Sequence, residues 1–189
     1  MDRHRNLLQR ESSLLLVVDM QAVFAETIAG WENVCRSVEL LVHAAKTLQV
    51  PVIATTQNAA KLGGLTPEVA AALGNVRLHD KLTFSCAQDP FASEAIRHPR
   101  RSQIVICGVE THICIAQTAL DLAASGYRVT VPADAVSSST VERHKLGMER
   151  LRDSEILPAS AEAVVYEWLG AAGTAEFRTM LPLLKENSA

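Results

Sequence analysis

Short apolar runs alternate with longer segments of helical periodicity along most of this chain. The first run, Leu14–Val18, is continuously apolar, as is typical of a central strand covered on both faces. After it, 32–49 repeats its apolar residues at helical spacing, and 141–153 is predicted to form another helix. Further strand-like runs lie at 50–55, 76–79, 104–107, 127–131 and 156–159. Strands that alternate with helices predict an α/β protein whose parallel sheet has helices on both faces.

Two residues indicate where further helices begin. Pro67 suits the first position of a short helix that ends at Leu73, because the amide N–H that proline lacks would be unpaired there anyway. Ser160 is a candidate N-cap for a helix through Leu169. A last helix is expected at 174–187, where Pro182 should kink or shorten it.

The length and composition are those of one ordinary globular domain. The chain has 189 residues, of which 48% are hydrophobic and 21% charged, enough to bury a sizeable core. It contains no repeat, low-complexity run or linker. We therefore expect a single domain over residues 1–189.

The charge balance indicates a small-molecule ligand. Eighteen Lys and Arg residues against twenty-one Asp and Glu residues give a net charge of −3, and there is no basic run. Nothing in this pattern favours binding to nucleic acid or to an anionic membrane surface. No apolar segment is long enough to span a bilayer. We expect a small-molecule substrate as partner, and neither nucleic acid nor membrane.

The four cysteines are Cys35, Cys86, Cys107 and Cys114, and they show neither CxxC spacing nor the density of a disulfide framework. The early apolar run is too short for a signal peptide and ends in Asp19. These features predict a reducing, cytoplasmic location.

Cys114 has an unusual position in the pattern. The strand at 104–107 is expected to end at Gly108, and a helix is expected from Thr111 to Ser125, so Cys114 should lie in the first turn of that helix. The helix dipole and the unpaired N–H groups of a first turn lower a thiol pKa and favour the thiolate. The alternative is that Cys114 is a small buried hydrophobe, as free cysteines usually are.

Three residues with useful chemistry follow predicted strands. Asp19 follows the first strand, Lys81 the third and Cys114 the fourth. In open parallel sheets, ligands bind outside the carboxyl ends of the strands. A nucleophilic thiol needs a base to take its proton and a cation to hold the charged state, and these three residues supply those roles.

Three motifs resemble those of the isochorismatase-like hydrolases, in their cysteine-hydrolase branch. The chain reads LLVVDMQ at 15–21, KLTFS at 81–85 and CGVETHIC at 107–114. With the QTALDL that follows at 117–122, the pattern is most similar to the isochorismatase domain-containing proteins of unassigned substrate. The resemblance covers nearly the whole chain.

The resemblance implies a Rossmann-like three-layer α/β/α fold with a six-stranded, mostly parallel sheet. It implies that Asp19 is the general base, that Lys81 is its electrostatic partner and that Cys114 is the nucleophile. It also implies a cis peptide between Val109 and Glu110, with the N–H groups of Glu110 and Cys114 forming an oxyanion hole. From position alone, the candidate substrate contacts are Gln21, Phe24, Gln57 and Thr111.

Two departures from the family limit what is carried over. Nicotinamidases hold a metal with an Asp-x-His pattern after the second strand, whereas this chain reads TQNA at 56–59. True isochorismatases lack the nucleophilic cysteine. We therefore expect no metal, no other cofactor and neither nicotinamide nor isochorismate as substrate. His112 is two residues from Cys114, a spacing that points side chains apart on a helix, so a direct role as its base is not expected.

The favoured function is therefore a metal-independent cysteine hydrolase of amidase type, acting on a small amide or related C–N bond through a Cys114 thioester. The alternative from a different class is a non-catalytic scaffold or interaction protein that keeps the fold. A thiol redox sensor at Cys114 is a third possibility, but no resolving cysteine is evident nearby.

The helix at 113–124 is apolar almost all round, with only Gln117, Thr118 and Asp121 polar. One face can pack on the sheet, and the opposite face then needs another surface. This pattern predicts a homo-oligomer.

Overall fold

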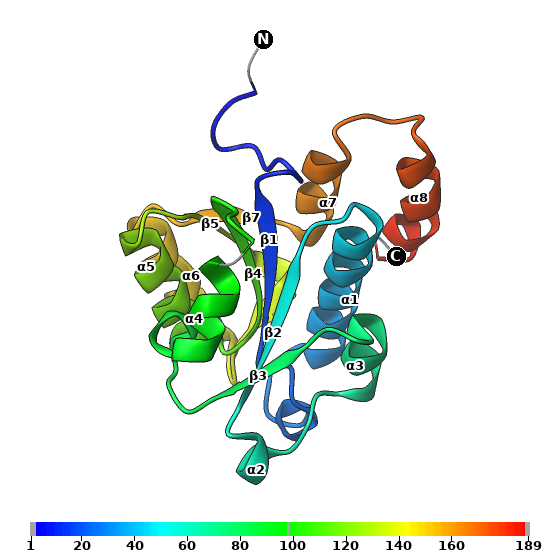
Figure 1. The fold of residues 1–189 in the computed structure, drawn as a ribbon. Coiled ribbons are helices and arrows are strands. Elements are labelled where there is room, and N and C mark those ends of the chain that lie inside the picture. The colour runs from blue at the N-terminus through cyan, green and yellow to red at the C-terminus, as the bar shows by residue number, and fades with distance from the viewer. Residues whose placement is uncertain (1–2, 98, 188–189) are drawn as a thin grey trace.

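The computed structural model describes residues 3–97 and 99–187, and a parallel β-sheet forms its centre (Figure 1). Along the sheet the strands run in the order β3-β2-β1-β4-β5-β7, and every pairing is parallel. Their bounds are β1 Ser13–Val18, β2 Val52–Gln57, β3 Leu78–Lys81, β4 Gln103–Val109, β5 Arg128–Pro132 and β7 Leu157–Ala159. A seventh strand of two residues, β6 (Val136–Ser137), pairs with the end of β4. The three-layer α/β/α fold is as predicted, with one strand more than the six expected. The additional strand is β6, which was not predicted because two residues are too few to give a sequence pattern.

Helices cover both faces of the sheet (Figure 1). The core cluster on one face includes residues of α1 (Trp31–Thr47), α3 (Pro67–Leu73), α7 (Ala161–Leu169) and α8 (Ala175–Asn187). The cluster on the other face includes residues of α4 (Pro90–Arg97), α5 (Ala116–Ala124) and α6 (Val141–Asp153). Short helical turns occupy several loops: η1 (Ala22–Phe24), α2 (Ala59–Leu62), η2 (Cys86–Gln88) and η4 (Ala133–Ala135). No helix within the described residues is long and apolar enough to cross a membrane.

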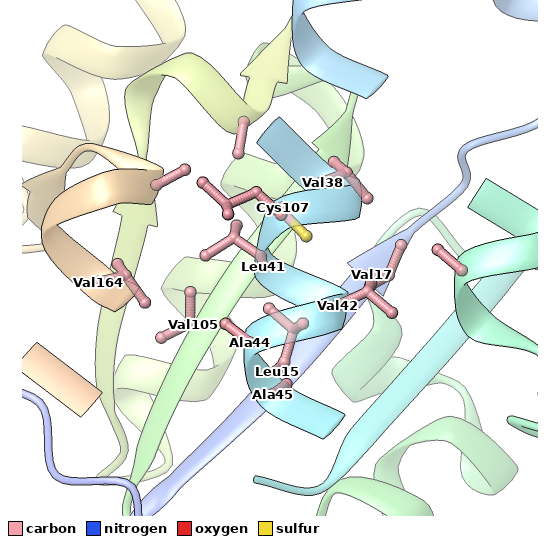
Figure 2. Close-up of a cluster of buried hydrophobic side chains, with 14 of the residues drawn as sticks. Leu15, Val17, Val38, Leu41, Val42, Ala44, Ala45, Val105, Cys107 and Val164 are labelled. Atoms are coloured by element: carbon pink, nitrogen blue, oxygen red, sulfur yellow. The ribbon is translucent and has the colours of Figure 1, made fainter. Parts of the chain in front are cut away.

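The apolar run of β1 serves both faces because successive strand residues point to opposite sides. Leu15 and Val17 belong to the cluster under α1, where Val105 and Cys107 of β4 join them (Figure 2). The alternate residues of β1, with Ile104 and Ile106 of β4, belong to the other cluster. Both strands are completely buried, so they form the rigid centre that carries the site.

Most of the predicted helices are confirmed. The helices at 67–73 and 141–153 have the predicted bounds, and the Ser160 hydroxyl accepts a hydrogen bond from the Ala163 amide as the N-cap of α7. The last helix contains Pro182 but runs on to Asn187, so the proline does not shorten it.

Two predictions around the nucleophile motif were wrong. The strand does not stop at Gly108 but continues through Val109. The helix after it is not α-helical throughout, because a π-helical turn, η3 (Thr111–Ile115), precedes α5.

Gly108 of β4 is paired with Val18 of β1. Its φ is +115°, and a Cβ atom there would lie 2.0 Å from the carbonyl oxygen of Val18. Only glycine fits this combination of conformation and space. The close approach sets the end of β4, and therefore the nucleophile loop, beside the end of β1.

Candidate active site

Asp19 and Lys81 form a buried ion pair at the carboxyl edge of the sheet. Asp19 directly follows β1, and Lys81 is the last residue of β3. Lys81 Nζ lies 2.7 Å from Asp19 Oδ2, and each residue is only 1% exposed. Strand β2 lies between β1 and β3, so the pair forms across an intervening strand.

The ammonium of Lys81 has two further neighbours. It donates a hydrogen bond to Gln57 Oε1 at 2.7 Å, and its Nζ lies 3.9 Å from Cys114 Sγ. Burial lowers the pKa of Lys81, but the Asp19 carboxylate and the nearby thiols outweigh this effect, so its pKa is raised above the usual value. Lys81 is therefore a permanent cation at neutral pH.

The Asp19 carboxylate is held on both oxygens. Its Oδ1 accepts a hydrogen bond from Thr55 Oγ1 at 2.8 Å, while its Oδ2 faces Lys81. The Asp19 amide donates to the Thr55 carbonyl oxygen at 3.2 Å, and the Asp19 φ is +54°. A backbone in this left-handed region turns the chain sharply out of β1, which places the carboxylate over the end of β2.

Cys114 lies in η3, ahead of α5, and is 7% exposed. The expectation of a lowered thiol pKa was wrong. The pKa of Cys114 is raised to about 12, mainly by burial and then by the Asp19 carboxylate, and Lys81 opposes both effects only in part. In the resting protein the group is a thiol, so it needs a base during attack, and the nearest carboxylate is Asp19.

The loop that precedes Cys114 has the backbone predicted from the family resemblance. The peptide between Val109 and Glu110 is cis. Glu110 Oε2 accepts a hydrogen bond from the Ser139 amide at 2.7 Å, which ties the loop to the segment before α6. The oxyanion hole formed by the Glu110 and Cys114 N–H groups stays a prediction.

Neither histidine near this loop contacts the thiol. The His112 ring lies 2.9 Å from Ser138 Oγ, and the His144 ring lies 3.0 Å from Thr111 Oγ1. Thr111, one of the candidate substrate contacts, is fully buried and its hydroxyl is paired with His144. These contacts anchor the nucleophile loop on α6 and on the segment before it.

The other three candidate substrate contacts are Gln21, Gln57 and Phe24. The Gln21 amide donates to the carbonyl oxygens of Gln57 and Gly63 and accepts from the Gln57 amide N–H. The Gln57 side chain lies against Lys81, and Phe24 is half-buried at the edge of the core. Their proposed contact with substrate stays a prediction.

Two neighbours of the site were missed by sequence reasoning. Thr55 holds Asp19, and the buried Cys86 has its Sγ 3.9 Å from Thr55 Oγ1. Thr55 could have been found from its place two residues before Gln57 in a strand, which puts both on one face. Cys86 lies in η2, where the sequence gives no signal of its position.

Within residues 3–97 and 99–187, no three His, Cys, Asp or Glu side chains gather in a way that could hold a metal ion. The segment 56–59, where nicotinamidases have an Asp-x-His pattern, supplies hydroxyl and amide groups instead.

A parallel α/β/α sheet that gathers a thiol, an ammonium and a carboxylate at its carboxyl edge has the layout of a cysteine hydrolase. More closely, the chain belongs to the isochorismatase family, because residues 13–163 match the isochorismatase domain. The family that the three motifs suggested is thereby confirmed, and with it a hydrolase role in the broad sense.

Individual relatives match over most of their length. The chain is 38% identical to the secreted isochorismatase effector Isc1 of Phytophthora sojae, covering 93% of this chain and 86% of that protein. It is 34% identical to isochorismatase domain-containing protein 2 of Xenopus laevis, with 95% and 86% covered. A solved structure described as the MAR1 ribonuclease from Caenorhabditis elegans superposes with a TM-score of 0.88 at 26% identity, covering 93% of this chain and 91% of the other.

Proposed function

We propose that this protein is a metal-independent cysteine hydrolase that cleaves a small amide or a related C–N bond. The observation that carries the proposal is the position of Lys81 Nζ, which is 2.7 Å from Asp19 Oδ2 and 3.9 Å from Cys114 Sγ inside a buried cluster. One cation is thus shared by a base and a nucleophile. A non-catalytic scaffold has no need for a buried charged cluster, which is costly to desolvate.

In the acylation step, Cys114 Sγ attacks the substrate carbonyl while its proton passes to Asp19. The pKa of about 12 that burial and Asp19 give Cys114 means that this proton must be removed during attack. The negative charge on the carbonyl oxygen would be stabilised by the N–H groups of Glu110 and Cys114. Asp19 then returns the proton to the nitrogen as the C–N bond breaks, and the amine leaves a thioester on Cys114.

In the deacylation step, water attacks the thioester. Asp19 takes a proton from the water, the carbon–sulfur bond breaks, and the proton goes to the departing sulfur. The Cys114 thiol and the Asp19 carboxylate are thereby restored, and the carboxylic acid product is released. Lys81 keeps its charge throughout and stabilises the Asp19 carboxylate in each resting state. Phe24 is the candidate to face the substrate, since the amides of Gln21 and Gln57 and the Thr111 hydroxyl are engaged within the chain.

The side chains at the site explain why we propose a mechanism without a metal ion. Lys81 already supplies the positive charge that a metal would supply. Gln57 lies in the segment where a nicotinamidase has its Asp-x-His pattern, and its side-chain amide is paired with Lys81. We also propose a reducing compartment such as the cytoplasm, because all four cysteines are free and buried.

A screen of small primary amides tests the proposal. Ammonia release should be accompanied by an acyl adduct on Cys114 in intact-mass spectra, and turnover should survive exhaustive chelation. Cys114→Ser should abolish the adduct, while Cys35→Ser, at a free cysteine on α1, is the matched control. Loss of activity with chelator that a divalent ion restores would refute the metal-independent mechanism.

The same screen separates the alternatives. An RNA oligonucleotide belongs in it as a counter-substrate, and we expect no cleavage, since the chain has a net charge of −3 and no basic run. If no amide is turned over and no adduct forms on Cys114, the scaffold function is favoured instead.

A further inference from the structure

Strand β2 lies between the strands that lead to Asp19 and Lys81, and two of its residues contact that pair. Thr55 and Gln57 are two apart in the strand, so their side chains lie on the same face. Thr55 Oγ1 donates to Asp19 Oδ1 at 2.8 Å, and Gln57 Oε1 accepts from Lys81 Nζ at 2.7 Å. The ion pair is therefore contacted from β2 on its acidic and its basic side at once.

The Thr55 contact fixes the orientation of the base. Thr55 is fully buried, and its single hydroxyl proton goes to Asp19, because an ionised carboxylate only accepts. With Lys81 on the other oxygen, the plane of the carboxylate is determined. The lone pairs that remain are those available to the proton of Cys114.

The Gln57 contact fixes the orientation of the ammonium. Gln57 Nε2 donates to the Leu82 carbonyl oxygen at 3.0 Å, which leaves Gln57 Oε1 to face Lys81. The backbone of Gln57 is held as well, because the Gln21 amide accepts from its N–H at 2.7 Å and donates to its carbonyl at 3.2 Å. Gln57 is thus held in place through both its backbone and its side chain, and an acceptor in a fixed position can orient the Lys81 ammonium.

We infer that Thr55 and Gln57 are positioning residues of the hydrolase, acting through Asp19 and Lys81 and together keeping Asp19 in its proton-accepting form. This inference rests on the proposed function, in which Asp19 is the base. The charged and titratable groups that face Asp19 are Lys81 from β3, Cys86 from η2 and Cys114 from η3.

The test is the pH dependence of Cys114 alkylation by iodoacetamide in the full chain, followed by peptide mapping, which needs no substrate. In the unmodified protein, the rate should rise with pH through an acid midpoint at which the thiol–carboxylate pair loses its first proton. Thr55→Val removes the hydroxyl at constant shape, so the midpoint should move up by about 0.5 to 1 pH unit, because a carboxylate that loses a donor holds its proton more tightly. Gln57→Met should move it in the same direction, because Lys81 is then less well directed at Asp19.

Three control variants distinguish positioning from a general structural effect. Thr55→Ser keeps the hydroxyl and should retain the original midpoint. Thr130→Val repeats the Thr55→Val change at a buried threonine of β5. Gln88→Met repeats the Gln57→Met change at a glutamine whose amide contacts Asp121 instead. Neither control variant should shift the midpoint. If Thr55→Val does not fold, as judged by its thermal melt, the comparison of Gln57→Met with Gln88→Met decides.

The outcomes separate this inference from the proposed function. An unchanged midpoint in folded Thr55→Val and Gln57→Met, or an equal shift in the control variants, overturns the positioning role. Asp19→Asn is the reference, because it should remove the midpoint altogether. If the midpoint persists in Asp19→Asn, Asp19 is not the base and the proposed function fails instead.

Discussion

Lys81 Nζ lies 2.7 Å from Asp19 Oδ2 although a whole strand, β2, separates the two strands that carry these residues. Neighbouring strands are about 4.8 Å apart, so the lysine and aspartate side chains together bridge about two such spacings. Both groups are almost completely buried. Removing either partner alone would leave an uncompensated buried charge, which makes the pair a unit in stability as well as in the proposed reaction.

Asp19→Asn should lower amide turnover by about 10²-fold or more, because the amide keeps the size of the carboxylate but cannot accept the thiol proton. Lys81→Met should act on the same step, since without its charge the carboxylate is less available as a base. The double mutant should be scarcely slower than the slower single mutant, because the two groups act together. Turnover and thermal melts of all three variants provide the measurement. Losses that simply multiply would contradict a shared role.

Cys114 should be the thiol that limited alkylation modifies first. All four cysteines are buried, and burial is the largest cause of the raised pKa of Cys114 and of Cys35. Lys81 lowers the pKa of both Cys114 and Cys86. Among the hydrogen-bond contacts of the described residues, however, only Cys114 has Lys81 within 3.9 Å of its sulfur, and Cys114 is 7% exposed whereas Cys86 is fully buried. Peptide mapping after brief treatment should show this preference, and Lys81→Met should remove it. Preferential labelling of Cys35 or Cys86 in the unmodified protein would argue against a reactive Cys114.

Gly108→Ala should destabilise the fold by more than about 4 kcal/mol. The backbone conformation at this position is strained for alanine, and the new Cβ would clash with β1. The clashing atom is the Val18 carbonyl oxygen, 2.0 Å from the Cβ position. Gly64→Ala is the matched control, since a Cβ there meets nothing within 4 Å. Urea unfolding of both variants measures the difference. A Gly108→Ala protein as stable as Gly64→Ala would show that β4 can move away from β1 at little cost.

The free energy of unfolding should fall as the pH rises above 9. Burial raises the pKa of Cys107 above its usual value of 9.0, so the folded state holds this proton more tightly than the unfolded state does. The resulting stability is present below pH 9 and is lost above it. Cys107→Ala should therefore make the alkaline slope shallower, by up to about 1.4 kcal/mol per pH unit. Urea unfolding of both proteins between pH 8 and 10.5 is the measurement, and equal slopes would count against a buried neutral thiol.

The protein should form a homo-oligomer, for a reason different from the one given by the sequence. Helix α5 contacts α6 and η2 of the same chain, so neighbours within the chain cover part of the surface that the sequence pattern left for a partner. Large apolar side chains are exposed instead around the edge strand β3: Leu78, Leu82, Phe84 and Phe91. Light scattering at micromolar concentration should give a multiple of the 20.5 kDa chain mass, and Phe91→Asp should reduce it. A monomer mass for the unmodified protein would contradict this prediction.

The sequence by itself determined most of the strands and helices, apart from β6 and the π-helical turn η3, and it placed the three site residues at or next to strand ends. These follow from short-range causes: apolar runs, helical spacing, Pro67 at a first helical position and Ser160 as a cap. Because the carboxyl ends of parallel strands share one edge, Asp19, Lys81 and Cys114 could be named as candidates before their distances were known.

Only the tertiary structure decided the order of the strands, and with it the surroundings of each site residue. The place of β2 between β1 and β3 brings Thr55 to Asp19 and Gln57 to Lys81, through contacts between residues far apart in the chain. The pKa of Cys114 was misjudged for the same reason. A helix dipole is a local property that sequence position suggests, whereas burial is the sum of everything that packs around the thiol, and here burial is the larger effect.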